Sequence, residues 1–330
     1  MQTILRTLAI QLALTAVSVF GQSKPAFEVA TVKPVVPMDQ ATMLAALQSG
    51  KMPYGANINN RRAEYTYLDL KTLLTYAYGV KPYQISGPDW MATTRFDIVA
   101  KMPEGSTKGD APKMLQSLLE ERFKLATHRT KVEHSVLALV VGKGGPKLKA
   151  SAGTPSAIDE NGPLKPGEMK MDSPDGPVRV KVDLATGSSV IDMGLMGKMS
   201  YRIVPTAQTI RLDFSMTTMS GLADMLTQMF TMFGGAGGRQ VVDLTEVKGN
   251  YDASIDVSLT DILAMARAQG MDIPGAVGGP AIGPAVASDP GSGGTSLSEA
   301  VRSMGLKLES RKAMVDQFIV DHVEKTPSEN

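Results

Sequence analysis

Histidines and their acidic neighbours are the first residues in this chain that could do chemistry. His128 and His134 lie on either side of Glu133, in a segment whose pattern predicts a β-hairpin. A strand pair could turn both imidazoles to one face, as a metal ion requires. No third ligand follows at a recognisable spacing, and Arg311 fills the place of His128 in a similar segment near the end of the chain. A solvated basic position is the simpler interpretation, so we expect no metal and no cofactor.

Other catalytic patterns are equally incomplete. A Ser-His-Asp triad is recognised by geometry, but no Gly-x-Ser-x-Gly segment is present to hold its nucleophile. Asp316 and Asp321 fit the end of a hairpin better than a pair of catalytic carboxylates, and His322 alternates with apolar neighbours as a strand-surface residue does. The glycine run 234–238 follows a predicted helix and precedes a strand, the reverse of a dinucleotide-binding loop. The sequence therefore predicts no catalytic residues.

A methionine stripe admits two interpretations. Met225, Met229 and Met232 fall at helical spacing, and thioethers are soft ligands for Cu(I). The same spacing is what any buried helix face produces, because Met fills irregular apolar gaps. Core packing is the more ordinary interpretation.

Three aromatic residues form the best candidate for a binding site. Trp90, the only tryptophan, closes the turn-rich segment 83–90, and Tyr83 and Tyr78 lie close to it along the chain. Exposed aromatic side chains on loops favour contacts with sugars or peptides. The alternative is that Trp90 covers its own core. We predict a ligand-binding site at Trp90, Tyr83 and Tyr78.

Composition narrows the class of protein. The 330 residues carry a formal net charge of +1, so the chain lacks the surplus of basic residues that nucleic-acid binding needs. Cysteine is absent, so disulfides, thiol nucleophiles and thiolate zinc sites are excluded. The length favours two domains.

The N-terminal sequence has the pattern of an export signal. Arg6 precedes a short apolar stretch at 8–20, and Val19 and Gly21 are the small residues that signal peptidase reads. The apolar stretch is shorter than the roughly 20 residues that span a bilayer. We predict a signal peptide at 1–21, no stable membrane span after its removal, and a periplasmic or extracellular location; retention of the segment as an anchor is the alternative.

Internal similarity sets the predicted architecture. Segments 123–141 and 306–323 each follow a short amphipathic helix, open with an apolar-Lys-Leu step and end in a β-rich run. The chain is therefore predicted to be α+β, with two tandem copies of a β-α-β-β-α-β-β module. The modules would span 22–148 and 206–325, the second with a Gly/Pro-rich insertion at 273–294. Residues 149–205 would form a linker with an inserted β-ribbon, and 326–330 a tail.

Several segments carry a resemblance to a known family. They are Phe27–Pro34, Ala77–Val80, Tyr83–Trp90, Arg95–Lys101, Met114–Leu125 and Val320–Asn330. As a set they resemble the Solibacter-type paralogous family of exported acidobacterial proteins, a domain of unknown function. In some relatives this domain is fused to a membrane metallopeptidase of the antirepressor type, which implies extracytoplasmic sensing; this chain has no His-Glu-x-x-His motif. Gly249-Asn-Tyr251 and the helix end at Gly305 are also distantly similar to the short N-terminal domains of secretins and TonB-dependent receptors.

These observations favour an exported, non-catalytic binding or interaction protein. Its partner would be a protein, peptide or glycan of the cell envelope, with a role in sensing or assembly, and not a nucleic acid. The alternative is an extracytoplasmic hydrolase that uses carboxylate or histidine residues.

Overall fold

Eleven of the described strands form one antiparallel sheet. The computed structural model describes residues 24–39, 41–42, 45–46, 49, 53–183, 185–232, 239–258 and 295–329. The predicted signal peptide at 1–21, the glycine run 234–238 and the insertion at 273–294 lie outside these residues. The strand order is β1 (Val29–Val35), β5 (Arg95–Lys101), β3 (Arg62–Asp69), β2 (Gly55–Ile58), β8 (Glu168–Ser173), β9 (Gly176–Asp183), β10 (Ser188–Asp192), β11 (Lys198–Val204), β12 (Thr209–Thr217), β14 (Tyr251–Ser258) and β7 (Lys149–Ala150).

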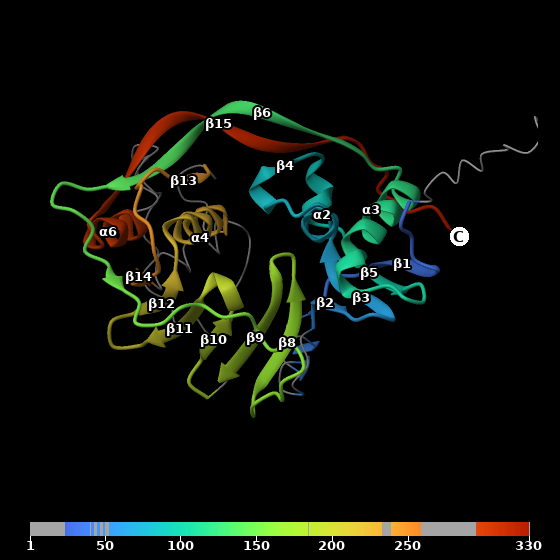
Figure 1. Cartoon of the computed structure of the whole chain (residues 1–330), viewed down its shortest axis with the longest axis horizontal. Helices are drawn as coiled ribbons and strands as arrows, with labels where there is room; N and C mark the ends of the chain where they lie inside the picture. Colours follow the sequence, from blue (N-terminus) through green and yellow to red (C-terminus); the bar gives the residue numbers. More distant parts are fainter. Residues whose placement is uncertain are drawn as a thin grey trace, which may run out of the picture.

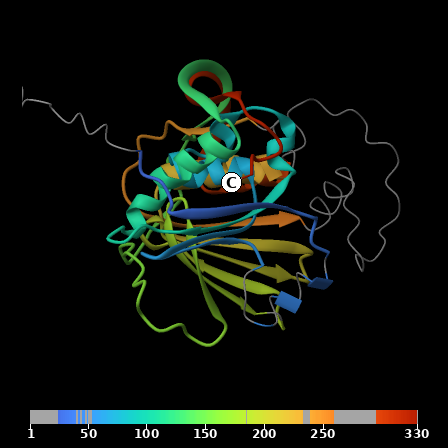
Figure 2. The same ribbon diagram turned by 90° about the vertical axis from the view of Figure 1, so that its right-hand side faces the viewer.

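A second sheet lies on the other side of the helices. Its order is β13 (Val241–Asp243), β6 (Ala126–Val141), β15 (Leu306–His322) and β4 (Ile85–Ser86). The long strands β6 and β15 pair antiparallel along nearly their whole length, while β13 runs parallel to β6 and β4 parallel to β15. In Figure 1 this two-stranded ribbon arches over the molecule, with α2 (Leu70–Tyr78) and α4 (Met219–Met232) between it and the large sheet. Figure 2 shows the same layers from the side.

The local sequence explains where helix α2 begins and ends. The side chain of Asp69 accepts a hydrogen bond from the N–H of Thr72 at 2.7 Å and so caps the start of α2. Gly79 ends the helix at a φ of 63°, a conformation that suits glycine. The predicted helix ending at Gly79 is therefore confirmed. Two further helices, α3 (Ala111–Arg122) and α6 (Thr295–Ser303), complete the helical layer, and no helix among the described residues is long and apolar enough to cross a membrane.

Two apolar cores form, and each is completed by a distant strand. The first lies among α2, α3, β3 and β5, where the rings of Phe96 and Phe123 meet edge to face with their centroids 5.0 Å apart. Phe318 of β15 enters this core. The second lies among α4, α6, β12 and β14, and Leu137 and Leu139 of β6 enter it. The N-terminal half of the chain is built around the first core and the C-terminal half around the second. The two halves are therefore interlocked through β6 and β15.

The prediction of an α+β fold built from two tandem β-α-β-β-α-β-β modules is wrong. The molecule is mostly β, with one continuous eleven-stranded sheet and four described helices. Each predicted terminal hairpin is instead a single long strand, β6 or β15, because neither segment carries the Gly or Pro that a tight turn favours. Residues 149–205, expected to be a linker with an inserted ribbon, contribute β7 to β11 and join both halves into one sheet. This topology also contradicts the proposed likeness to the secretin and TonB-receptor domains.

Candidate functional site

The three aromatic residues predicted to bind ligand lie in three different environments. Tyr78, at the end of α2, packs against Phe318 with ring centroids 4.7 Å apart. Trp90 lies in the short helix η2 (Asp89–Ala92) and packs against the first core. Tyr83 lies in η1 (Pro82–Gln84), and its hydroxyl donates to a carboxylate oxygen of Asp224 on α4 at 2.8 Å. The structure does not gather these side chains around one pocket.

Tyr83 takes part in a polar junction between the two halves. Lys81 forms an ion pair with Asp175 at 2.8 Å and lies 3.8 Å from Asp224, the acceptor of the Tyr83 hydroxyl. Burial raises the pKa of Tyr83, and its bond to Asp224 raises it further. The junction therefore ties η1 to α4 and to the β8–β9 turn, a structural role that sequence spacing could not reveal.

A pocket of about 360 Å³ lies between the first half and the β8–β9 hairpin. We call it the tyrosine pocket. Its volume is at the lower end of the range for small-molecule sites. It is lined by Ile58, Tyr65, Tyr76, Lys108, Gly109, Pro112, Glu160, Asp172, Ser173, Pro174 and Gly176.

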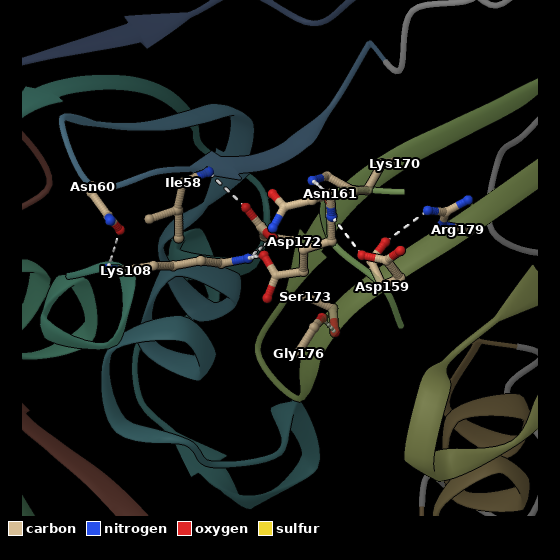
Figure 3. A network of polar contacts seen from close by, with 11 residues as sticks. Ile58, Asn60, Lys108, Asp159, Asn161, Lys170, Asp172, Ser173, Gly176 and Arg179 are labelled. Carbon is tan, nitrogen blue, oxygen red and sulfur yellow. Dashed lines mark hydrogen bonds and ion pairs between the residues drawn. The ribbon is translucent and has the colours of Figure 1, made fainter. Parts of the chain in front are cut away.

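The charged groups of the tyrosine pocket are paired with one another. Asp172, only 4% exposed, accepts from Lys108 at 2.5 Å and from the N–H of Ile58 at 2.6 Å. The ammonium group of Lys108 also contacts Glu160 at 2.6 Å. Burial opposes the charge on Lys108, but hydrogen bonds to Asp172 and Glu160 outweigh it and raise the pKa of Lys108. Figure 3 shows this network, with Lys108 reaching across to Asp172.

The rim of the pocket is held in place by the hairpin. Arg179 of β9 donates to the carbonyl oxygen of Asp159 at 2.7 Å, and Lys170 of β8 donates to that of Glu160 at 2.8 Å. Within the loop, the N–H of Asn161 donates to the side chain of Asp159 at 3.0 Å (Figure 3). The loop that carries Glu160 is therefore preorganised beside Lys108.

The two tyrosines differ in how their hydroxyl groups are used. Tyr76 donates to the carbonyl oxygen of Asp172 at 2.6 Å. Tyr65, on β3, is only 1% exposed, and its hydroxyl has no hydrogen-bond partner in the part of the chain that the structure describes. The rings meet edge to face with centroids 5.6 Å apart. Burial raises the pKa of both phenols, so both stay protonated at neutral pH.

The histidines lie away from this pocket. His128, on the exposed face of β6, has its Nδ1 2.9 Å from the carboxylate of Asp321 on β15. His134 is also exposed and stands opposite Ala313. Across the described ranges, no group of three His, Cys, Asp or Glu side chains is arranged to hold a metal ion.

Sequence reasoning missed the tyrosine pocket. Asp172 falls in the segment 149–205, which the sequence predicts to be a linker, and Lys108 lies in a stretch where no motif marks a single charge. Tyr65 carried a usable signal, because strand alternation puts it on the face opposite to Glu64 and Thr66, and a buried tyrosine hydroxyl usually needs a partner.

Comparison with known proteins places the chain in a family. A family model described as "Protein of unknown function (DUF3738)" matches residues 71–323. The chain belongs to this family. The matched region includes Tyr76, Lys108 and Asp172, and begins just after Tyr65. Neither the curated proteins nor the solved structures contain a match to this DUF3738 protein.

Proposed function

We propose that this DUF3738 protein is an exported binding protein that holds a ligand in the tyrosine pocket and does no chemistry on it. The observation that carries the proposal is the hydroxyl of Tyr65. Tyr65 is 1% exposed as a whole residue and lines the pocket, and no described residue accepts its hydroxyl proton; the hydroxyl is not among the fully buried atoms that lack a partner, so it opens onto the pocket. A donor that opens onto a mostly apolar pocket and has no acceptor in the protein is available to a ligand, and a ligand that supplies an acceptor would gain from the contact.

The electrostatics of the tyrosine pocket favour binding over acid–base catalysis. A general acid or base works best when its pKa is near the ambient pH and its proton is free to move. Lys108 is held by two carboxylates that raise its pKa, and burial raises the pKa of Tyr65 and Tyr76. These groups therefore keep their protons at neutral pH. A hydrolase using carboxylate or histidine residues is the alternative to test.

The expected cellular setting comes from the sequence. Arg6 and the apolar stretch at 8–20 support export to the periplasm or beyond. The resemblance to exported acidobacterial proteins, some fused to membrane metallopeptidases, supports a role in envelope sensing or assembly. The ligand would then be part of an envelope protein, peptide or glycan, or a small molecule present there.

Pocket occupancy can be tested with purified protein lacking residues 1–21. Neutral oligosaccharides, short peptides and small ring compounds would be titrated while the backbone amide signals of Gly109 and Gly176 are followed by NMR. Saturable shifts of both pocket glycines, with no change at Gly142, which follows β6 and bonds to Gly305 outside the pocket lining, would support the proposal. No response to any of the three classes would contradict it.

The absence of chemistry needs its own measurement. Chromogenic glycosides, esters and peptides would be incubated with the same protein, with Asp172→Asn as the comparison. Turnover that disappears in the Asp172→Asn variant would replace binding with hydrolysis as the function.

A further inference from the structure

We infer that the tyrosine pocket takes a neutral, ring-shaped molecule with a carbonyl acceptor, and that Tyr65 donates a hydrogen bond to that carbonyl. This inference rests on the proposed binding function and specifies the class of ligand. It is carried by the walls of the pocket, by the free hydroxyl and by the balance of charge around the mouth.

The walls are mainly apolar and partly aromatic. Tyr65 and Tyr76 present rings, and Ile58, Pro112 and Pro174 add aliphatic surface. Flat rings pack well against aromatic edges and proline faces, and they lose little conformational freedom on binding. A ring therefore fits these walls better than a flexible charged chain.

The hydroxyl of Tyr65 sets the polar requirement. The neighbouring Tyr76 hydroxyl is already committed to the carbonyl oxygen of Asp172 at 2.6 Å, and the carboxylate of Asp172 is occupied by Lys108 and Ile58. Tyr65 alone among these groups has a proton with no described acceptor. Because burial raises its pKa, the phenol is a neutral donor at physiological pH. A carbonyl oxygen on the ligand would satisfy it.

The charge around the pocket disfavours an anion. Asp172 and Glu160 contribute two negative charges and Lys108 one positive charge, so the network carries a net charge of −1. The single ammonium group already contacts both carboxylates, and none of the three groups is left to neutralise a ligand carboxylate. A cationic amidinium suits the charge but offers no acceptor for the Tyr65 proton. A neutral carbonyl meets both conditions.

Three probes of one shape test this directly. They are 2-naphthamide, 2-naphthoate and 2-naphthamidine, with 2-methylnaphthalene as a ring that lacks an acceptor. Affinity would be measured by calorimetry and by the NMR shifts of Gly109 and Gly176. We expect the amide to bind at least about tenfold more tightly than the carboxylate, since an uncompensated charge is costly in an apolar site.

Two matched variants isolate the hydroxyl. Tyr65→Phe should weaken 2-naphthamide by about five- to tenfold, the usual effect of one hydrogen bond, and leave 2-methylnaphthalene unchanged. Its melting temperature should stay the same or rise, because no internal partner is lost. Tyr201→Phe removes a hydroxyl on β11, outside the pocket lining, and should leave all four affinities unchanged.

The opposing results are distinct. Equal or tighter binding of 2-naphthoate or 2-naphthamidine would overturn the ligand class. Unchanged amide affinity in Tyr65→Phe, or a lowered melting temperature, would show that the hydroxyl does not serve the ligand. If no naphthalene probe binds but an oligosaccharide or peptide shifts the pocket glycines, this inference fails while the proposed binding function stands.

Discussion

The carboxylate of Asp172 and the ammonium group of Lys108 lie 2.5 Å apart, although 64 residues separate them in the chain. Asp172 also occupies the position where β2 and β8 pair, opposite Ala56. The ion pair therefore closes the joint between the first half of the large sheet and the hairpin that follows it. It forms one wall of the tyrosine pocket and also stabilises the sheet there.

Removing the cation should destabilise this joint. Lys108→Met leaves the buried carboxylate of Asp172 with only the N–H of Ile58, and we expect a loss of about 1–3 kcal/mol in the free energy of unfolding. Lys131→Met is the matched control, because Lys131 and Asp316 are both 70% exposed and their ion pair is worth little. Urea denaturation gives the free energy of unfolding of both variants. Equal losses would show that the Lys108 contacts stabilise the fold no more than an exposed ion pair does.

The contribution of Lys108 should depend on pH with a definite sign. A raised pKa means that the folded state holds the proton more tightly than the unfolded chain. The stabilisation is thus fully present below the unfolded pKa of about 10.4 and is lost as the pH rises through the folded value. The stability difference between the wild type and Lys108→Met should be constant at neutral pH and shrink above that range. A difference that grows with pH would contradict the assignment.

The buried phenols of Tyr65 and Tyr76 should ionise at a higher pH than ordinary tyrosines. Burial raises the pKa of Tyr65 and Tyr76, so the unfolded chain loses these protons first and stability falls as the pH rises above about 10. Phenolate absorbance should grow in two stages, the second together with loss of circular dichroism. Tyr65→Phe should reduce only the second stage. A smaller first stage in Tyr65→Phe would mean that this hydroxyl is open to solvent.

The pairing of β6 with β15 can be tested by cross-linking. Lys131 and Asp316 stand opposite one another in the ladder, so cysteines at these two positions should form a disulfide under mild oxidation. The chain has no cysteine of its own to interfere. The control pair Lys131→Cys with Lys312→Cys is offset by four residues, or about 13 Å along the strand, and should stay reduced. Two separate hairpins would leave both pairs uncross-linked.

Export should remove the N-terminal segment. Expressed in a native-like host, the protein should have a new N-terminus at Gln22, because Val19 and Gly21 suit signal peptidase. Intact mass and N-terminal sequencing of the envelope and culture fractions would check this. Chains that keep Met1 in a cytoplasmic fraction would refute it.

Local features of this protein could be predicted well. The strand Arg95–Lys101 and the helix ending at Gly79 follow from alternation, capping and a left-handed glycine, all of which depend on residues a few positions apart. The two β-rich runs, 123–141 and 306–323, resemble one another in sequence, and this pattern predicts two hairpins where the structure has two long strands paired with each other. The missing information was the partner of each run, since a strand pattern does not say which strand lies beside it.

The sequence by itself determined the net charge, the absence of cysteine, the apolar N-terminal stretch and many of the short elements. Only the tertiary structure decided that β6 and β15 pair with each other and that Tyr65, Tyr76, Lys108 and Asp172 surround one pocket. The bond from the N–H of Ile58 to Asp172 spans 114 residues, and that from Tyr76 to Asp172 spans 96. Contacts at such separations depend on strand order and register, which burial of the whole apolar surface selects and no short motif records.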